Sequence, residues 1–194
     1  MLGGNFLKKT FYMMRHGQTL FNVRRKIQGA CDSPLTEEGI KQAEEASRYF
    51  DGITIDHAYS STSERACDTL EIVTHNQLNY TRTKGLKEMD FGTFEGESED
   101  LNPEDKSTFF LQYGGESREQ VRKRLVKTCQ DIMRKGDHQN VLAVSHAGAC
   151  LHFLSHWQDP SEILKGGFPN CMILKYEYES EAESFKLVEV CRPI

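Results

Sequence analysis

The chain has 194 residues, a formal net charge of −5 and six cysteines. Its length suits a single domain over residues 1–194, and its negative charge excludes a general attraction to nucleic acid or to an anionic membrane. No apolar stretch is long enough for a signal peptide or a membrane span. The cysteines form no C-x-x-C pair, so we expect a reduced, cytoplasmic protein, although their even number leaves a disulfide framework open.

Apolar runs alternate with helical periodicity along the chain, which indicates parallel βαβ units. Strands are predicted at 11–14, 58–61 and 141–144, and helices follow at 37–50, 66–73, 118–135 and 147–157. Thr36 is the expected N-cap of the first helix, and its apolar positions predict an inner face of Ile40, Ala43, Ser47 and Phe50.

The C-terminal half has equally clear boundary signals. Ser117 to Gln120 matches a capping box, and the helix that it begins should stop at Gly136. Residues 172–176 and 185–190 predict an antiparallel hairpin at the sheet edge. The whole pattern predicts an α/β fold, a three-layer αβα arrangement with a mostly parallel sheet, one antiparallel edge strand and a small lid excursion.

An acidic segment at 95–105 interrupts the alternation and is followed by Phe109, Phe110 and Tyr113. One interpretation is a solvated surface loop with a short helix. The other is a lid, about residues 92–116, whose aromatic side chains line a substrate pocket together with Phe91 and Phe94.

Two histidines follow predicted strands at glycine-containing loops. Arg15-His16-Gly17 follows the first strand, and Ser145-His146-Ala147-Gly148 follows the strand at 141–144. Because the carboxyl ends of parallel strands meet at one edge of a sheet, we expect the two imidazoles to lie close together. There they could divide covalent and acid/base work between them.

Further motifs occur in a fixed order between these histidines. They are Gln18-Thr19 with Asn22, Gln28-Gly29, the run from Asp32 to Gly39, Tyr59-Ser60-Ser61, Arg65 to Thr69, Leu86-Lys87-Glu88 with Phe91-Gly92, and Glu95-Gly96. Over roughly residues 11–150 the chain closely resembles the histidine phosphatase superfamily, which includes phosphoglycerate mutase-like enzymes, and it is most similar to the short phosphatase branch.

The resemblance implies a role for each matching residue. His16 is expected to be the nucleophile that forms a phosphohistidine, Glu88 the acid that protonates the leaving alkoxide, and His146 a charge-stabilising neighbour. Arg15 and Arg65 suit phosphate oxygens because a guanidinium offers several planar donors. The expected substrate-binding residues are Asn22, Gln28, Thr19, Gly17 and Ala147.

These residues predict a metal-independent phosphomonoesterase of the histidine acid phosphatase kind, without a cofactor, acting on a small phosphorylated metabolite. Two alternatives remain: a cofactor-dependent phosphoglycerate mutase-type phosphotransferase, and a non-catalytic phospholigand-binding module. The short stretch between Glu88 and His146 favours hydrolysis, because a small lid lets water reach the phosphohistidine. The sequence leaves the oligomeric state open, a homodimer included.

Two further patterns carry open alternatives. His152 and His156 lie four residues apart on a predicted helix, a spacing that can hold a metal, although packing or solvation is the simpler interpretation. Arg24-Arg25-Lys26 is the one basic run that suggests a second phosphate site, although a solvated loop is the simpler interpretation.

Overall fold

The computed structural model describes residues 8–193 and is built on one six-stranded sheet with the order β3-β2-β4-β1-β5-β6. Strands β1, β2, β3 and β4 are mutually parallel, β5 runs antiparallel to β1, and β6 pairs antiparallel with β5. The strands are β1 (Lys9–Arg15), β2 (His57–Ser60), β3 (Tyr80–Arg82), β4 (Asn140–Ser145), β5 (Ile173–Glu179) and β6 (Ser184–Cys191).

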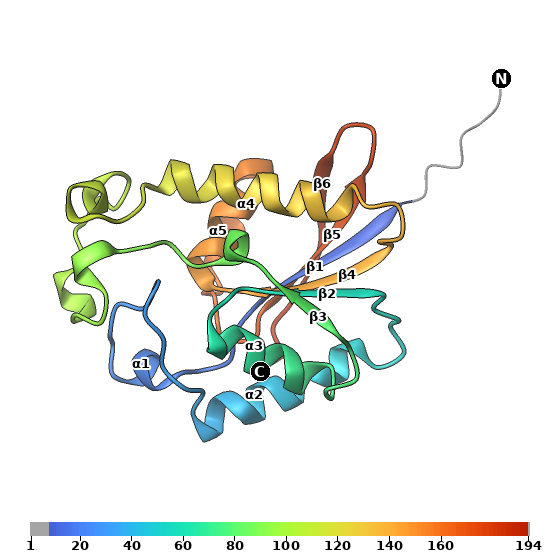
Figure 1. The fold of residues 1–194 in the computed structure, drawn as a ribbon, viewed down its shortest axis with the longest axis horizontal. Coiled ribbons are helices and arrows are strands. Elements are labelled where there is room, and N and C mark those ends of the chain that lie inside the picture. Colours follow the sequence, from blue (N-terminus) through green and yellow to red (C-terminus); the bar gives the residue numbers. More distant parts are fainter. Residues whose placement is uncertain (1–7, 194) are drawn as a thin grey trace.

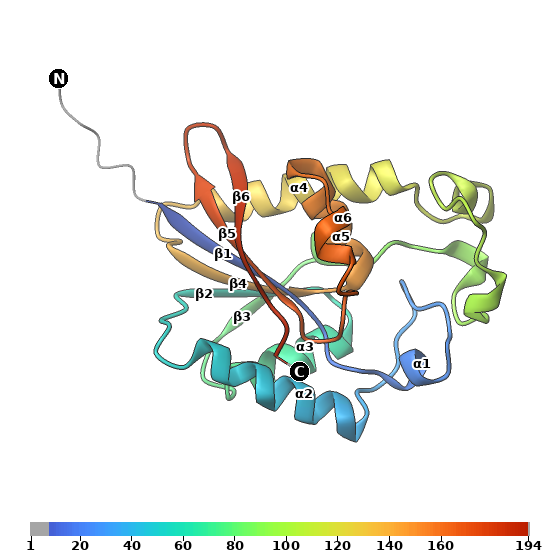
Figure 2. The same ribbon diagram turned by 180° about the vertical axis from the view of Figure 1, so that it is seen from behind.

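Helices cover both faces of the sheet. In Figure 1, α4 and α5 lie above it and α2 and α3 lie below it, while Figure 2 shows α6 next to α5. The helices are α1 (Leu20–Val23), α2 (Glu37–Ser47), α3 (Glu64–Val73), α4 (Arg118–Met133), α5 (Ala147–Trp157) and α6 (Ser161–Leu164). The predicted three-layer αβα class is confirmed, with the antiparallel β5 one place in from the edge because β6 covers it.

The two central strands explain this layering. Val141, Leu142, Ala143 and Val144 of β4 are fully buried, and their side chains alternate between two clusters. One cluster packs under α4 and α5 and the other under α2 and α3. A strand that is apolar at every position therefore requires cover on both faces.

None of the helices between residues 8 and 193 combines the length and the apolar character that a membrane crossing needs.

Helix α2 begins where predicted, because the Thr36 hydroxyl accepts a hydrogen bond from the N–H of Gly39. Ala43 and Ser47 are buried on its inner face as predicted, together with Gly39 and Ala46, but Ile40 is 40% exposed. The prediction for Ile40 is wrong because Gly39 packs directly on the loop at Gln18, where any Cβ would meet the Gln18 carbonyl oxygen at 2.0 Å. This contact turns Ile40 outward.

Helix α4 has the predicted capping box between Ser117 and Gln120. It ends at Met133, before the predicted stop at Gly136. The Lys9 ammonium donates to the carbonyl oxygens of Met133 and Lys135, so a side chain from β1 satisfies acceptors that a C-terminal glycine motif would otherwise satisfy.

The segment 92–116 extends from the end of the molecule where α1 lies (Figure 1). It contains three short 3₁₀ turns, Gly92–Phe94, Glu99–Leu101 and Phe109–Tyr113. Its aromatics pack mainly on one another, for example Phe94 on Tyr113 with ring centroids 4.9 Å apart, and Phe110 is fully buried. Phe91 is the aromatic side chain of the predicted set that lines a pocket.

Candidate active site

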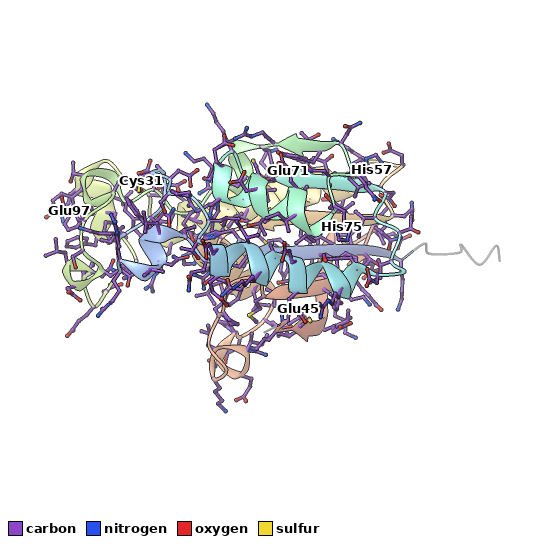
Figure 3. The ribbon with its side chains drawn as sticks, turned by 90° about the horizontal axis from the view of Figure 1, so that it is seen from below. Cys31, Glu45, His57, Glu71, His75 and Glu97 are labelled. Atoms are coloured by element: carbon purple, nitrogen blue, oxygen red, sulfur yellow. The ribbon has the colours of Figure 1, made fainter. Side chains whose placement is uncertain are left out.

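The two predicted histidines meet at the carboxyl edge of the central strands. Arg15 at the end of β1 pairs in register with Ser145 at the end of β4, so His16 and His146 leave the sheet side by side. Their ring centroids are 5.2 Å apart and the ring planes lie at 66°. In Figure 3, Cys31 marks this end of the molecule and His57 the opposite end.

His16 is 4% exposed and is held in one tautomer by its contacts. Its Nδ1 lies 2.7 Å from the carbonyl oxygen of Gly17, which can only accept, so Nδ1 carries the proton. Its Nε2 accepts a hydrogen bond from Nε of Arg65 at 3.3 Å. Nε2, which keeps its lone pair, is therefore the nucleophilic atom of this ring.

Gly17 fixes this arrangement by allowing a close approach of two segments. A Cβ at Gly17 would lie 2.5 Å from the carbonyl oxygen of Gly39 in α2. Its N–H donates to the Thr69 hydroxyl on α3. Gly17 thus positions the nucleophile through its backbone and is not among the residues that line the pocket.

Arg65 is a fully buried cation at the start of α3. Its Nη1 donates to the Cys31 carbonyl and to a carboxylate oxygen of Asp32 at 2.8 Å, and its Nη2 donates to the Gly29 carbonyl. These acceptors hold the guanidinium against His16. The ion pair with Asp32 was not predicted from the sequence, because the two residues come from separate elements.

His146 is also fully buried, and its Nε2 lies 2.8 Å from the Ser61 hydroxyl. Its Nδ1 is buried and has no partner among the described residues. An Nδ1 that carries the ring proton could donate to a phosphoryl group on His16. Ser61 ends the Tyr59-Ser60-Ser61 motif and follows β2 directly, but its contact with His146 was not predicted from the sequence.

Glu88 is 8% exposed and takes a backbone hydrogen bond on each carboxylate oxygen. Oε1 accepts from the N–H of Met89 and Oε2 from the N–H of Gly148, both at 2.9 Å. A Cβ at Gly148 would come within 2.6 Å of Oε1, so only glycine leaves room for the carboxylate at this turn of α5.

Arg15 and Asn22 present free donors to the same pocket. Nη1 of Arg15 donates to the Phe168 carbonyl, while its Nε is buried without a partner among residues 8–193. Oδ1 of Asn22 accepts hydrogen bonds from the N–H of Thr19 and from the side-chain amide of Asn170. Its Nδ2 is therefore the group that can donate to a ligand in the pocket. Both side chains therefore offer N–H groups where a phosphate oxygen would lie.

The remaining predicted residues divide into pocket-lining and supporting positions. Gln28 and Ala147 line a pocket of about 170 Å³ together with Arg15, His16, Asn22 and Glu88. Thr19 does not line it: this fully buried side chain caps α1 and donates to Oε1 of Gln28 at 2.8 Å. Arg65 and His146 are fully buried beside the pocket, in contact with His16 and Ser61 respectively.

Glu95, at the start of the acidic segment, has a structural role that was not specifically predicted from the sequence. The Glu95 carboxylate accepts hydrogen bonds from four backbone N–H groups, those of Gly29, Ala30, Cys31 and Phe91. Burial alone would raise the pKa of Glu95, but these bonds and that from the Cys31 thiol lower it overall. Glu95 therefore ties the loop that holds Arg65 to the segment 92–116.

Burial and charge set opposite protonation states for the site's histidines and its acid. Burial, followed by the charges of Arg65 and Arg15, lowers the pKa of His16 well below its usual value. Burial and then Arg65 do the same to the pKa of His146. Burial raises the pKa of Glu88, against the opposing effect of its two backbone hydrogen bonds. These shifts favour the neutral form of both imidazoles and the protonated form of Glu88.

We expect the free energy of unfolding to fall as the pH drops below about 6.5, the ordinary pKa of histidine in an unfolded chain. Between that pH and the lowered native values, the unfolded chain binds protons that His16 and His146 do not bind. Each residue should contribute a slope of about 1.4 kcal/mol per pH unit there. Urea unfolding at pH 7.5, 6.0 and 5.0 measures the slope of the free energy of unfolding against pH. An equal slope in the double variant His16→Asn/His146→Asn would contradict the buried neutral state.

The alternative metal and basic motifs have other placements. Within residues 8–193, the one group of three ligating side chains is His57, Asp137 and His138, at the far end of the sheet. The rings of His57 and His138 stack in parallel 3.6 Å apart, so their in-plane lone pairs do not converge on one point. Among residues 8–193, no third ligating side chain lies close enough to form a metal site with His152 and His156.

In the basic run, Arg25 pairs with Asp100, whereas Lys26 lines the pocket. The run as a whole therefore does not form a second phosphate site. Lys26 is the member that could contact a ligand at His16.

Comparisons with known proteins agree with this geometry. The probable phosphoglycerate mutase GpmB of Proteus mirabilis is 32% identical over 146 residues, 70% of this chain and 68% of that protein. The structure of Bacillus stearothermophilus YhfR superposes with a TM-score of 0.81 at 25% identity, covering 92% of this chain and 95% of that one. Phosphoserine phosphatase of Entamoeba histolytica, solved with 3-phosphoglyceric acid, has a TM-score of 0.77 at 26% identity, covering 93% and 95%.

The family match is longer than the stretch of motifs. Residues 11–190 match the histidine phosphatase superfamily, branch 1, so the match continues past residue 150 through the C-terminal hairpin. It includes both histidines, Arg65 and Glu88, which the fold gathers at one edge of the sheet. This chain belongs to the histidine phosphatase superfamily.

Proposed function

We propose that this protein is a metal-independent phosphomonoesterase that hydrolyses small phosphate esters through a phosphohistidine at His16. The observation that carries the proposal is the tautomer of His16: the Gly17 carbonyl holds the proton on Nδ1 and leaves the Nε2 lone pair beside Arg65. A ring that served only to bind phosphate would instead need Nε2 as a donor.

In the first step, Nε2 of His16 attacks phosphorus and the bond from phosphorus to the ester oxygen breaks. Glu88 transfers its proton to that oxygen, which leaves as an alcohol. Donors from Arg15, Arg65, Asn22 and His146 hold the three remaining phosphoryl oxygens, where charge is concentrated in the transition state. The raised pKa of Glu88 keeps the proton available at mildly acidic pH.

In the second step, a water molecule attacks phosphorus on the side that the alcohol has left. The Glu88 carboxylate accepts a proton from this water, the phosphorus–nitrogen bond breaks, and inorganic phosphate is released. The electron pair returns to Nε2, so His16 is again neutral. Because one group serves first as acid and then as base, its pKa has to lie near the working pH. Burial raises the pKa of Glu88 from its ordinary value, and its two backbone N–H donors oppose that rise.

The names of the relatives include both mutases and phosphatases, so the balance between the two reactions is the finer part of the proposal. Hydrolysis is supported by the short segment 92–116, which carries a larger pocket on its inner side next to Glu88. That space gives water a route to the phosphohistidine. We propose that this segment is a lid within a single domain, and that the six free cysteines reflect a reducing, cytoplasmic setting.

A rate survey over phosphate monoesters tests the reaction. We expect release of inorganic phosphate from p-nitrophenyl phosphate without added metal, unaffected by a chelator and inhibited by vanadate. The survey includes 3-phosphoglycerate with and without 2,3-bisphosphoglycerate. Conversion to 2-phosphoglycerate that outpaces phosphate release would instead establish a mutase, and tight phosphate binding without any turnover would establish a binding module.

A further inference from the structure

A second pocket, of about 740 Å³, adjoins the phosphate pocket and shares Glu88, Phe91 and Lys106 with it. Since Glu88 is the proposed proton donor to the leaving oxygen, the alcohol half of a substrate seated at His16 extends past Glu88 into this space. Its volume lies in the range of roughly 300–1,000 Å³ typical of sites for drug-sized ligands. The pocket therefore fits an alcohol considerably larger than a three-carbon acid.

Two cations without a carboxylate partner face this pocket. Lys106 comes from the segment 92–116 and Arg118 from the first turn of α4, and neither side chain forms an ion pair or hydrogen bond with any residue between 8 and 193. Burial and then the charge of Arg118 lower the pKa of Lys106, against a smaller effect of Glu99. Two unneutralised like charges at one cavity are stabilised by a bound anion.

The other residues that line the pocket are largely apolar or uncharged. Leu151 of α5, Leu164 of α6 and Met89 contribute apolar surface to the pocket that Glu88 and the two cations also line. His152 stands beside them with a pKa lowered to about 4 by burial and by Arg118, so at neutral pH it is an uncharged hydrogen-bonding group. Arg122, one turn after Arg118, is already paired with Glu119.

We propose that the substrate is a phosphate ester of a large alcohol that carries a second anionic group, a carboxylate or a phosphate, bound by Lys106 and Arg118. This inference rests on the proposed phosphatase function and adds the substrate class to it. The phosphoryl group lies at His16, the apolar part of the alcohol packs on Leu151, and the second anion lies at the junction of the segment 92–116 with α4.

Matched synthetic esters test this assignment. Hexyl phosphate, 6-phosphooxyhexanoate and hexane-1,6-diol bisphosphate share one leaving carbon chain and differ only in the distal group. We expect kcat/KM of the wild-type protein to be roughly 10- to 100-fold higher for at least one of the two distal anions than for hexyl phosphate, the range for a hydrogen bond to a charged group. Comparing the carboxylate with the bisphosphate shows which anion the site takes.

In Arg118→Gln, the ratio of kcat/KM for the preferred distal-anion ester to kcat/KM for hexyl phosphate should fall toward one. The matched control is Arg48→Gln, which removes the same charge from an exposed, ion-paired position after α2, on the other face of the sheet. The control should keep the wild-type preference. Equal rates for all three esters in the wild-type protein, or the same loss of preference in Arg48→Gln, would overturn the second anion site. Failure to hydrolyse any of the three would instead contradict the phosphatase function.

Discussion

Replacing His16 with alanine is expected to lower kcat by roughly 10⁴- to 10⁶-fold, the loss typical when an enzyme's nucleophile is removed. Among the described residues, His16 is the only histidine that lines the phosphate pocket. Steady-state release of phosphate from p-nitrophenyl phosphate measures the effect. In the wild-type protein, acid-labile and alkali-stable label from a ³²P substrate should also be trapped on the chain, and His16→Ala should trap none.

Two controls make this experiment decisive. His156→Ala removes an exposed histidine that packs edge-on against Trp157, and it should keep wild-type turnover and labelling. His16→Ala should still bind inorganic phosphate, because the donors of Arg15, Arg65 and Asn22 remain, and a phosphate-dependent rise in melting temperature would show that the variant is folded. Full activity in His16→Ala would reject the phosphohistidine mechanism.

Glu88→Gln should separate the two halves of the reaction. An alkyl phosphate needs a proton on its leaving oxygen, so we expect its hydrolysis to slow by roughly 10²- to 10⁴-fold. The p-nitrophenolate anion leaves without a proton, so the first turnover of p-nitrophenyl phosphate should be much less affected. Activation of water would then limit the rate, giving a burst of p-nitrophenolate and an accumulated phosphoenzyme in stopped-flow and quench experiments.

The pH dependence of the wild-type protein provides the matching control. Because burial raises the pKa of Glu88 and lowers that of His16, phosphoryl transfer from an alkyl phosphate should be fast at acidic to neutral pH. It should fall at higher pH as Glu88 loses its proton. In Glu88→Gln this alkaline fall should disappear from the first turnover. An alkaline limb that persists unchanged in the variant would assign the acid to another group.

Local sequence patterns were sufficient for most of the fold. The fully apolar run 141–144 predicted a strand buried on both faces, and the capping signals at Thr36 and Ser117 placed the starts of α2 and α4 correctly. Strand β3 was not predicted, because Tyr80–Arg82 is short and carries two exposed residues, so it has neither apolar alternation nor length. Its pairing with β2 depends on the neighbour that the fold provides.

The candidate site followed the same division. The positions of His16 and His146 after two predicted strands were enough to predict that they share one edge of the sheet. Arg65 and Glu88 were added to the site by the resemblance to the family. Ser61 and Asp32 lay within motifs of the resemblance, but their contacts with His146 and Arg65 were not predicted, since each contact joins residues far apart in the chain. Local periodicity contains no information about such pairs.

The sequence by itself determined the layered α/β fold, the family and the gathering of both histidines at one sheet edge, because these depend on periodicity and on motifs within short stretches. Only the tertiary structure decided the His16 tautomer, the buried setting of Glu88 and the convergence of Lys106 with Arg118. The state of His16 needs the contact of its Nε2 with Arg65 on α3, and the setting of Glu88 needs the N–H of Gly148 on α5. Lys106 and Arg118 meet at a pocket that α5 also lines. Each of these contacts joins segments that lie apart in the chain, so no single run of residues encodes them.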